Sequence, residues 1–356
     1  MRQKIMHVRA FHLVLMFVLG LSGQTIRSRP SPPPQPETGP GGKQAAHSSV
    51  IKNRYGKGGT EYWIYEPDKP KPKQAPVVIF LHGWGGTNPL YYGAWIDHIV
   101  KRGNIVVFPR YQSSILTRRE DFIPNTLEAI KTALKQLQTE PGHVRPDLSR
   151  VATVGHSLGG VLSASVAALA HESGIPRVKA VMSVEPGLTG EPAMVPMADL
   201  KKIESDTLLL SIAGDRDTLV DDYDAKRIYN ESTRVSAGNK DFVRLVSDDR
   251  GFPSLIANHR APTAPDKEYD NGEGDLTTPR SPRSSGGADS EADSPRNPAV
   301  NALDYYGTWK LFDALCDAAF FGKNRQYALG NTPQQRFMGR WSDGVAVKEL
   351  VVTDKP

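Results

Sequence analysis

The sequence has almost no cysteine. Only Cys316 occurs among 356 residues, so the chain cannot form a disulfide with itself. This residue lies in the apolar segment KLFDALCDAAFF, where we expect a small buried side chain rather than a nucleophile or a metal ligand. The sequence therefore favours an activity that does not depend on cysteine.

Hydrophobic runs long enough to cross a bilayer are also missing. The apolar run Ala10–Leu21 has 12 residues, whereas a membrane-spanning helix needs about 20. Basic residues precede the run, and the small residues Ser22 and Gly23 follow it, which is typical of a signal peptide. We expect residues 1–23 to be a signal peptide and the protein to be exported, either secreted or periplasmic. An N-terminal segment that stays uncleaved and anchors the protein to a membrane is the alternative.

The sequence has no Lys/Arg-rich block. Lys and Arg total 44 and Asp and Glu total 39, which gives a net charge of +5. A nucleic-acid-binding surface would need a Lys/Arg-rich segment with interleaved aromatic residues, and none is found. The sequence predicts scattered, solvated charges and no nucleic-acid partner.

Proline and glycine gather in two tracts. Residues 24–49 contain RPSPPPQPETGPGGK and predict a flexible, extended linker. Residues 263–298 have almost no large apolar side chains and predict a disordered insert. The chain from residue 50 to residue 356 is predicted to form a single domain around this insert.

Between the two tracts, apolar runs alternate with segments of helical spacing. The predicted strands are 60–67, at a sheet edge, then 75–83, 103–111, 149–155, 177–187, 206–215 and 240–248. The predicted helices are 125–138, 161–174, 221–232 and 301–322. This alternation predicts an α/β fold, with a mostly parallel central sheet flanked by helices on both faces. The site is expected in the loops at the carboxyl ends of the strands.

The segment GHSLGG, residues 155–160, joins a predicted strand directly to a predicted helix. Such a sharp turn brings neighbouring elements close, and glycine at positions 155 and 159 avoids collisions. The turn lifts Ser157 above the sheet, at the positive end of the next helix. The G-x-S-x-G pattern is common by chance, but its place between a strand and a helix predicts a nucleophilic serine.

A serine hydroxyl needs a base and an orienting acid to act as a nucleophile. In a turn of this kind, the acid and then the histidine follow the serine along the chain. The strand TLLLSIAGDRDTLV ends on two candidate acids, Asp215 and Asp217. Further on lies His259, and no histidine follows it. Ser157, Asp217 and His259 therefore occur in the expected order.

These motifs resemble the α/β-hydrolase superfamily, and within it the compact, lidless serine esterases of the lipase, cutinase and dienelactone-hydrolase type. The resemblance covers residues 62–321 and rests on HGWGG (82–86), GHSLGG (155–160), GDRDTLV (214–220) and NHRAP (258–262). It implies that Asp217 is the acid, while Asp215 caps or braces the loop. It also implies that the N–H groups of Trp84 and Leu158 bind the oxyanion, a contribution of about 3 kcal/mol per donor.

Other polar and aromatic residues near these motifs have structural alternatives. His82 is expected to hold its turn, and His156 to pack on a neighbouring strand. Trp84 and Tyr111 either line an acyl pocket or cover the end of the sheet. Glu185 follows a strand on the same side, where it either shapes the pocket or serves as a cap.

The sequence thus predicts a serine carboxylester hydrolase that works through an acyl-enzyme, without metal or organic cofactor. Its substrate would be a small-molecule or lipid ester. About 20 residues join Glu185 to Asp206, which leaves no room for a large lid. The alternatives are an acyltransferase or a peptidase with the same triad, or an inactive hydrolase-like binding protein.

Overall fold

The computed structural model describes residues 29–273 and 300–356. The expected signal peptide, residues 1–23, lies outside the described residues, as do residues 274–298 of the expected insert. In the described part of the chain, no helix combines the length and the apolar character needed to cross a bilayer.

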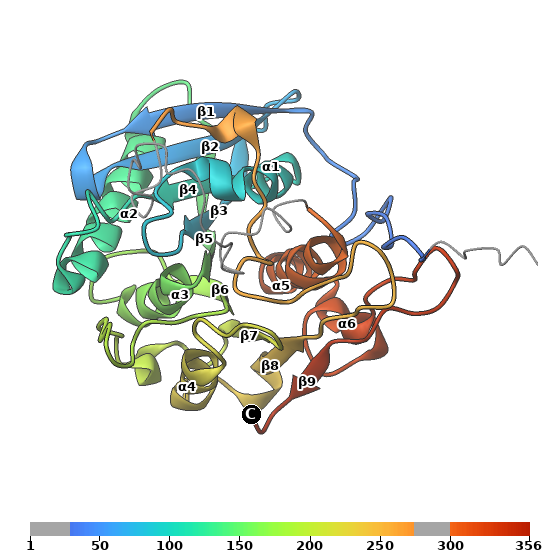
Figure 1. The fold of residues 1–356 in the computed structure, drawn as a ribbon. Coiled ribbons are helices and arrows are strands. Elements are labelled where there is room, and N and C mark those ends of the chain that lie inside the picture. Colours follow the sequence, from blue (N-terminus) through green and yellow to red (C-terminus); the bar gives the residue numbers. More distant parts are fainter. Residues whose placement is uncertain (1–28, 274–299) are drawn as a thin grey trace, which may run out of the picture.

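A nine-stranded, mostly parallel sheet runs through the molecule (Figure 1). In sheet order, its strands are β1 (Ser49–Tyr55), β2 (Tyr62–Asp68), β4 (Ile105–Pro109), β3 (Gln74–Leu81), β5 (Arg145–His156), β6 (Val178–Val184), β7 (Leu208–Gly214), β8 (Lys240–Leu245) and β9 (Val351–Thr353). The pairs β1–β2, β2–β4 and β8–β9 are antiparallel, and all other neighbours are parallel. The predicted α/β fold is confirmed.

Helices cover both faces of this sheet (Figure 1). They are α1 (Gly93–Lys101), α2 (Phe122–Thr139), α3 (Leu158–Leu169), α4 (Tyr223–Glu231), α5 (Trp309–Phe321) and the short α6 (Pro333–Arg336). Successive side chains of a strand point to opposite faces, so β3 contributes to two cores. Val78 and Phe80 pack with α1 and α5, whereas Ile79 and Leu81 pack with α2 and α3.

The predicted edge strand, residues 60–67, corresponds to β2, but it does not lie at the edge. β1 pairs with it along seven residues, from Ser49 opposite Asp68 to Tyr55 opposite Tyr62. The expectation was wrong because β1, with the sequence SVIKNRY, lies at the sheet edge and carries polar side chains. Its stability comes from backbone pairing and not from an apolar run.

Part of the expected linker, residues 24–49, is packed against the domain. The Gly41 N–H donates to Asp313 Oδ2 over 2.7 Å, and the Phe252 N–H donates to the Pro30 carbonyl over 2.9 Å. The description of residues 29–48 as a free spacer was therefore wrong. Proline correctly indicates an extended chain, but a stiff extended chain also loses little entropy when it docks on a surface.

The first residues of the expected insert, 263–298, are packed as well. The N–H groups of Ala264 and Asp266 donate to carbonyls of Tyr91 and Leu90, both over 2.9 Å. Tyr269 is buried, and its ring centroid lies 5.2 Å from that of Tyr65. Residues 263–273 thus belong to the folded domain. The composition of the segment predicted the start of the insert too early. A few backbone hydrogen bonds and one buried aromatic side chain are enough to fix residues 263–273 on the domain.

The connection between β6 and β7 is short and mostly irregular. It contains one 3-10 turn, Leu200–Lys202. Within residues 29–273 and 300–356 no large lid covers the carboxyl ends of the strands, as the sequence predicts. The loops that follow β3, β5, β6, β7 and β8 therefore define the candidate site.

Candidate active site

Ser157 occupies the sharp turn between β5 and α3. Its backbone has φ 56° and ψ −125°, a conformation that side-chain-bearing residues rarely adopt. A Cβ added to Gly155 would lie 2.1 Å from the Gly159 carbonyl oxygen, and one added to Gly159 would lie 2.0 Å from the Leu81 carbonyl oxygen. Both distances are far below van der Waals contact. The two glycines are thus required by close backbone packing around the serine.

The structure brings the other two predicted residues to Ser157. His259 Nε2 lies 2.9 Å from Ser157 Oγ, and His259 Nδ1 lies 2.7 Å from Asp217 Oδ2. Because a carboxylate accepts hydrogen bonds, Nδ1 carries the proton and Nε2 can accept the serine O–H. Ser157 and Asp217 are buried, while the His259 side chain is 14% exposed. In this geometry the imidazole can take a proton from the serine.

The two candidate acids have different partners. Asp217 Oδ1 accepts the N–H groups of Leu219, over 3.0 Å, and Val220, over 3.2 Å, which leaves Oδ2 for His259. Asp215 instead accepts the N–H of Ser247 over 2.9 Å and the hydroxyl of the same residue. Asp215 therefore braces the loop against the end of β8, and Asp217 is the carboxylate at the histidine.

The two predicted oxyanion donors lie close to Ser157 on separate elements. Leu158 is the first residue of α3, and Trp84 follows Gly83 in the loop after β3. A Cβ on Gly83 would lie 3.3 Å from Ser157 Cβ, so this loop passes directly beside the serine. In the described residues, neither the Trp84 N–H nor the Leu158 N–H donates to another protein group. Both are available to a negatively charged oxygen.

The roles of His156 and Tyr92 were missed by sequence reasoning. His156 Nε2 lies 2.8 Å from the His259 carbonyl oxygen, so this nitrogen is the donor. His156 Nδ1 then accepts the hydroxyl of Tyr92, over 2.9 Å, and that hydroxyl accepts the Gly83 N–H over 3.0 Å. Burial lowers the pKa of His156 well below its usual value, with the nearby His259 as a second cause, so the ring is neutral. His156 was expected to pack on a strand, and Tyr92 belongs to none of the recognised motifs.

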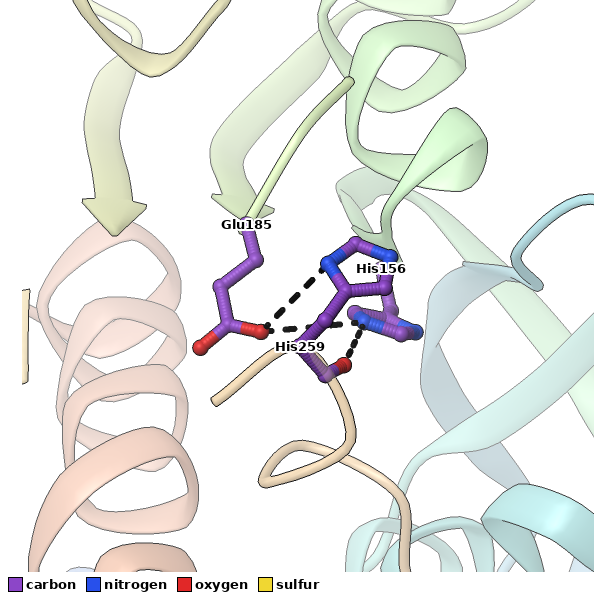
Figure 2. A group of neighbouring side chains, drawn as sticks. All are labelled: His156, Glu185 and His259. Carbon is purple, nitrogen blue, oxygen red and sulfur yellow. Dashed lines mark hydrogen bonds and ion pairs between the residues drawn. The ribbon is translucent and has the colours of Figure 1, made fainter. Parts of the chain in front are cut away.

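A further carboxyl group, that of Glu185, lies beside the two histidines (Figure 2). Its Oε2 is 3.9 Å from both His259 Nδ1 and His156 Nε2. The side chain is fully buried, and neither oxygen has a hydrogen-bond partner in the described residues. Burial, followed by the charge of Asp217, raises the pKa of Glu185 well above its usual value. The sequence left Glu185 as a pocket or cap residue, and the structure places it against the histidine.

Glu185, His156 and His259 are close enough together to suggest a metal site. A metal would require an unprotonated nitrogen from each histidine. As the rings are placed, His156 Nε2 donates to a carbonyl and His259 Nδ1 donates to Asp217. The cluster is therefore arranged for hydrogen bonding and does not present metal ligands.

The remaining candidates support the loops. His82 is buried, and its ring nitrogens lie 2.6 Å from the carbonyl oxygens of Gly83 and Arg110, so it holds the turn after β3. Its ring stacks on Tyr111, with centroids 4.1 Å apart. Tyr111 is fully buried and covers the end of the sheet. Trp84 is partly exposed and packs edge-on against Phe122.

A serine on a strand–turn–helix, with an acid and a histidine on later loops of a mostly parallel sheet, defines the α/β-hydrolase class. The fold is that of the α/β-hydrolase superfamily, and two comparisons with known proteins support this class. A family model described as Chlorophyllase matches residues 60–205. Esterase LipI of Mycobacterium tuberculosis is 31% identical over 120 residues, which is 33% of this chain and 36% of LipI.

The two matches cover only part of the proteins compared. The chain aligns with about a third of the length of Esterase LipI. The family match contains Ser157, Trp84, Leu158 and Glu185, and it ends before Asp217 and His259. The family match is therefore independent of the loops that carry Asp217 and His259.

Proposed function

We propose that this protein is a serine carboxylester hydrolase. The similarity to the Chlorophyllase family model and to an esterase supports ester hydrolysis in general. The observation that carries the finer assignment is the continuous contact from Ser157 Oγ to His259, over 2.9 Å, and from His259 to Asp217, over 2.7 Å. These three side chains come from separate loops. A histidine without a catalytic role would not be expected to contact both the serine hydroxyl and the aspartate carboxylate.

In the proposed reaction, His259 Nε2 takes the Ser157 proton as Oγ attacks the ester carbonyl carbon. Asp217 keeps the imidazolium oriented, and the N–H groups of Trp84 and Leu158 stabilise the negative oxygen. The intermediate collapses, the proton passes from His259 to the alcohol, and an acyl-enzyme remains. Water then repeats the sequence, releases the carboxylic acid and restores Ser157.

The surroundings of the site favour an ester with an apolar acyl or alcohol part. Leu116, Met194 and Leu219 lie on the loops after β4, β6 and β7, and they are 84%, 56% and 72% exposed. The three loops adjoin one another, because Arg119 donates to the Pro192 carbonyl over 3.3 Å and Gly187 packs on the Val220 side chain. Covering such side chains with an apolar group contributes about 25 cal/mol per Å². Small-molecule and lipid esters both meet this requirement.

Labelling with a fluorophosphonate and hydrolysis of nitrophenyl esters of increasing acyl length test the proposal. We expect labelling and turnover in the parent, loss of both in Ser157→Ala, and loss of turnover in His259→Ala with the fold retained. Ser149→Ala, at an exposed site in the first half of β5 and away from the turn at the end of that strand, is the matched control and should behave as the parent. Labelling that persists in Ser157→Ala, or turnover of His259→Ala within a few-fold of the parent, would contradict the assignment. Absence of any labelling would instead indicate a binding protein.

A further inference from the structure

We propose that Glu185 is a reserve acid for His259, able to replace Asp217 as the carboxylate that accepts the Nδ1 hydrogen bond. This inference rests on the proposed function, because it assigns a role to a residue beside the proposed base. Figure 2 shows the Glu185 carboxyl group directed from the end of β6 toward the two histidine rings.

A small movement of the Glu185 side chain would bring its carboxyl group within hydrogen-bond distance of His259 Nδ1. Its Oε2 is 3.9 Å from Nδ1, and a hydrogen bond to the ring would need about 2.9 Å. Neither carboxyl oxygen has a partner in the described residues, so no hydrogen bond to them holds the side chain back. The backbone is fixed, since the Glu185 N–H donates to the Ile212 carbonyl over 2.8 Å.

Burial first, and the charge of Asp217 second, raise the pKa of Glu185 and keep it uncharged in the native site. The titratable groups that face Glu185 are His156 from β5, Asp217 from the loop after β7, and His259 from the loop after β8. Two carboxylates beside one imidazole cannot both ionise at low cost. Asp217 has two backbone N–H donors and the closer contact with His259, so it takes the charge. Removal of Asp217 removes that repulsion and leaves the imidazolium without an anion, which favours ionisation of Glu185.

A double-variant experiment tests this role. Turnover of a short-chain nitrophenyl ester is compared in the parent, Glu185→Gln, Asp217→Ala and the combined variant, each checked for folding by circular dichroism. We expect Glu185→Gln alone to lose less than tenfold in turnover, and less than Asp217→Ala loses, because glutamine is an uncharged isostere. We expect the combined variant to be at least tenfold slower than Asp217→Ala. The pH–rate profile of Asp217→Ala should also show a carboxyl limb that the combined variant lacks.

Two outcomes would overturn the role. One is a combined variant within threefold of Asp217→Ala. The other is a loss of more than tenfold in Glu185→Gln alone, since Glu185 would then act in the native site. Asp304→Asn, which changes a buried carboxyl group in another part of the fold, is the control and should not slow Asp217→Ala further.

If Asp217→Ala fails to fold, Asp217→Asn replaces it, because asparagine keeps an oxygen for the N–H groups of Leu219 and Val220. Failure of the proposed function is distinguished by Ser157→Ala. If that variant retains the parent's turnover, the catalytic assignment itself is wrong, whatever the effect of Glu185.

Discussion

At the scale of single residues, His156 connects the nucleophile turn to two other loops of the site. It precedes Ser157, donates to the His259 carbonyl over 2.8 Å and accepts the Tyr92 hydroxyl over 2.9 Å. Tyr92 in turn accepts the Gly83 N–H, in the loop that carries the proposed oxyanion donor Trp84. One chain of hydrogen bonds therefore fixes the backbone of the proposed base relative to the oxyanion loop.

His156→Phe should slow turnover by about tenfold or more while substrate binding changes little. Phenylalanine fills the space but leaves the His259 carbonyl and the Tyr92 hydroxyl without this partner, which costs about 1–3 kcal/mol in a buried site. As a positioning residue, His156 should affect kcat more than KM in ester hydrolysis. Tyr92→Phe, which removes the bonds to Gly83 and to His156 Nδ1 but keeps the bond from His156 to the His259 carbonyl, should have a smaller effect. A change in KM alone would argue against this role.

The site residues that the sequence predicts lie in recognisable local motifs or in a fixed order along the chain. The residues that it misses reach the site only through the fold. Ser157 and Asp217 lie in local motifs, and His259 is the last histidine of the chain, so order alone selects it. Tyr92 and Glu185 lie against side chains that are distant from them in sequence. Their contacts exist only because β3, β5, β6 and β7 are adjacent in the sheet, an order that the sequence pattern does not specify.

At the scale of elements, the closing helix differs in detail from the predicted helix over 301–322. It begins as a π-helix, Leu303–Thr308, and continues as α5. Asp304, in the π-helical turn, is buried, and its Oδ1 has no hydrogen-bond partner in the described residues. Burial raises the pKa of Asp304 from 3.8 to about 8. The helix thus carries an uncharged carboxylic acid at neutral pH.

This carboxyl group predicts a pH dependence of stability. Between pH of about 4 and about 8, the unfolded chain releases the Asp304 proton while the folded chain keeps it. The folded state then binds more protons, so the free energy of unfolding falls as pH rises through this range. Asp304→Asn removes this contribution to the pH dependence of the free energy of unfolding. We expect the difference in Tm between pH 5 and pH 8 to be smaller in this variant than in the parent, and an unchanged difference would contradict the burial effect.

Apolar runs identified the central strands well, since burial on both faces demands continuous hydrophobic sequence. β3 to β8 all lie within or overlap predicted segments. The sequence patterns did not predict β1 and α1, each for a different reason. β1 is a half-exposed edge strand with few apolar residues, and α1 is a nine-residue helix, too short for its spacing to stand out.

At the scale of the whole molecule, the N-terminal segment joins the body of the domain to its C-terminal part. Gly41 contacts Asp313 in α5, Pro30 contacts the loop before His259 through Phe252, and Tyr306 donates to the Pro34 carbonyl over 3.2 Å. Asp313 also accepts from His98 Nε2, over 2.8 Å, so the segment closes over an interface between α1 and α5. Composition predicts an extended chain here, but the partner surface is built from residues some 270 positions away.

Two glycines of this segment test whether its docking stabilises the fold. Gly41 and Gly39 both have positive φ, 76° and 84°, so alanine is strained to a similar degree at either position. A Cβ on Gly41 would lie 1.9 Å from the Tyr305 carbonyl oxygen, whereas a Cβ on Gly39 would meet nothing within 4 Å. Gly41→Ala should therefore lower Tm by several degrees more than Gly39→Ala, because only the first variant forces the segment off α5. A chain that begins at Ser49 should resemble Gly41→Ala when both are compared in thermal unfolding with a chain that begins at Arg29. Equal Tm values for the two alanine variants would mean that residues 29–48 lie on the domain without contributing to its stability.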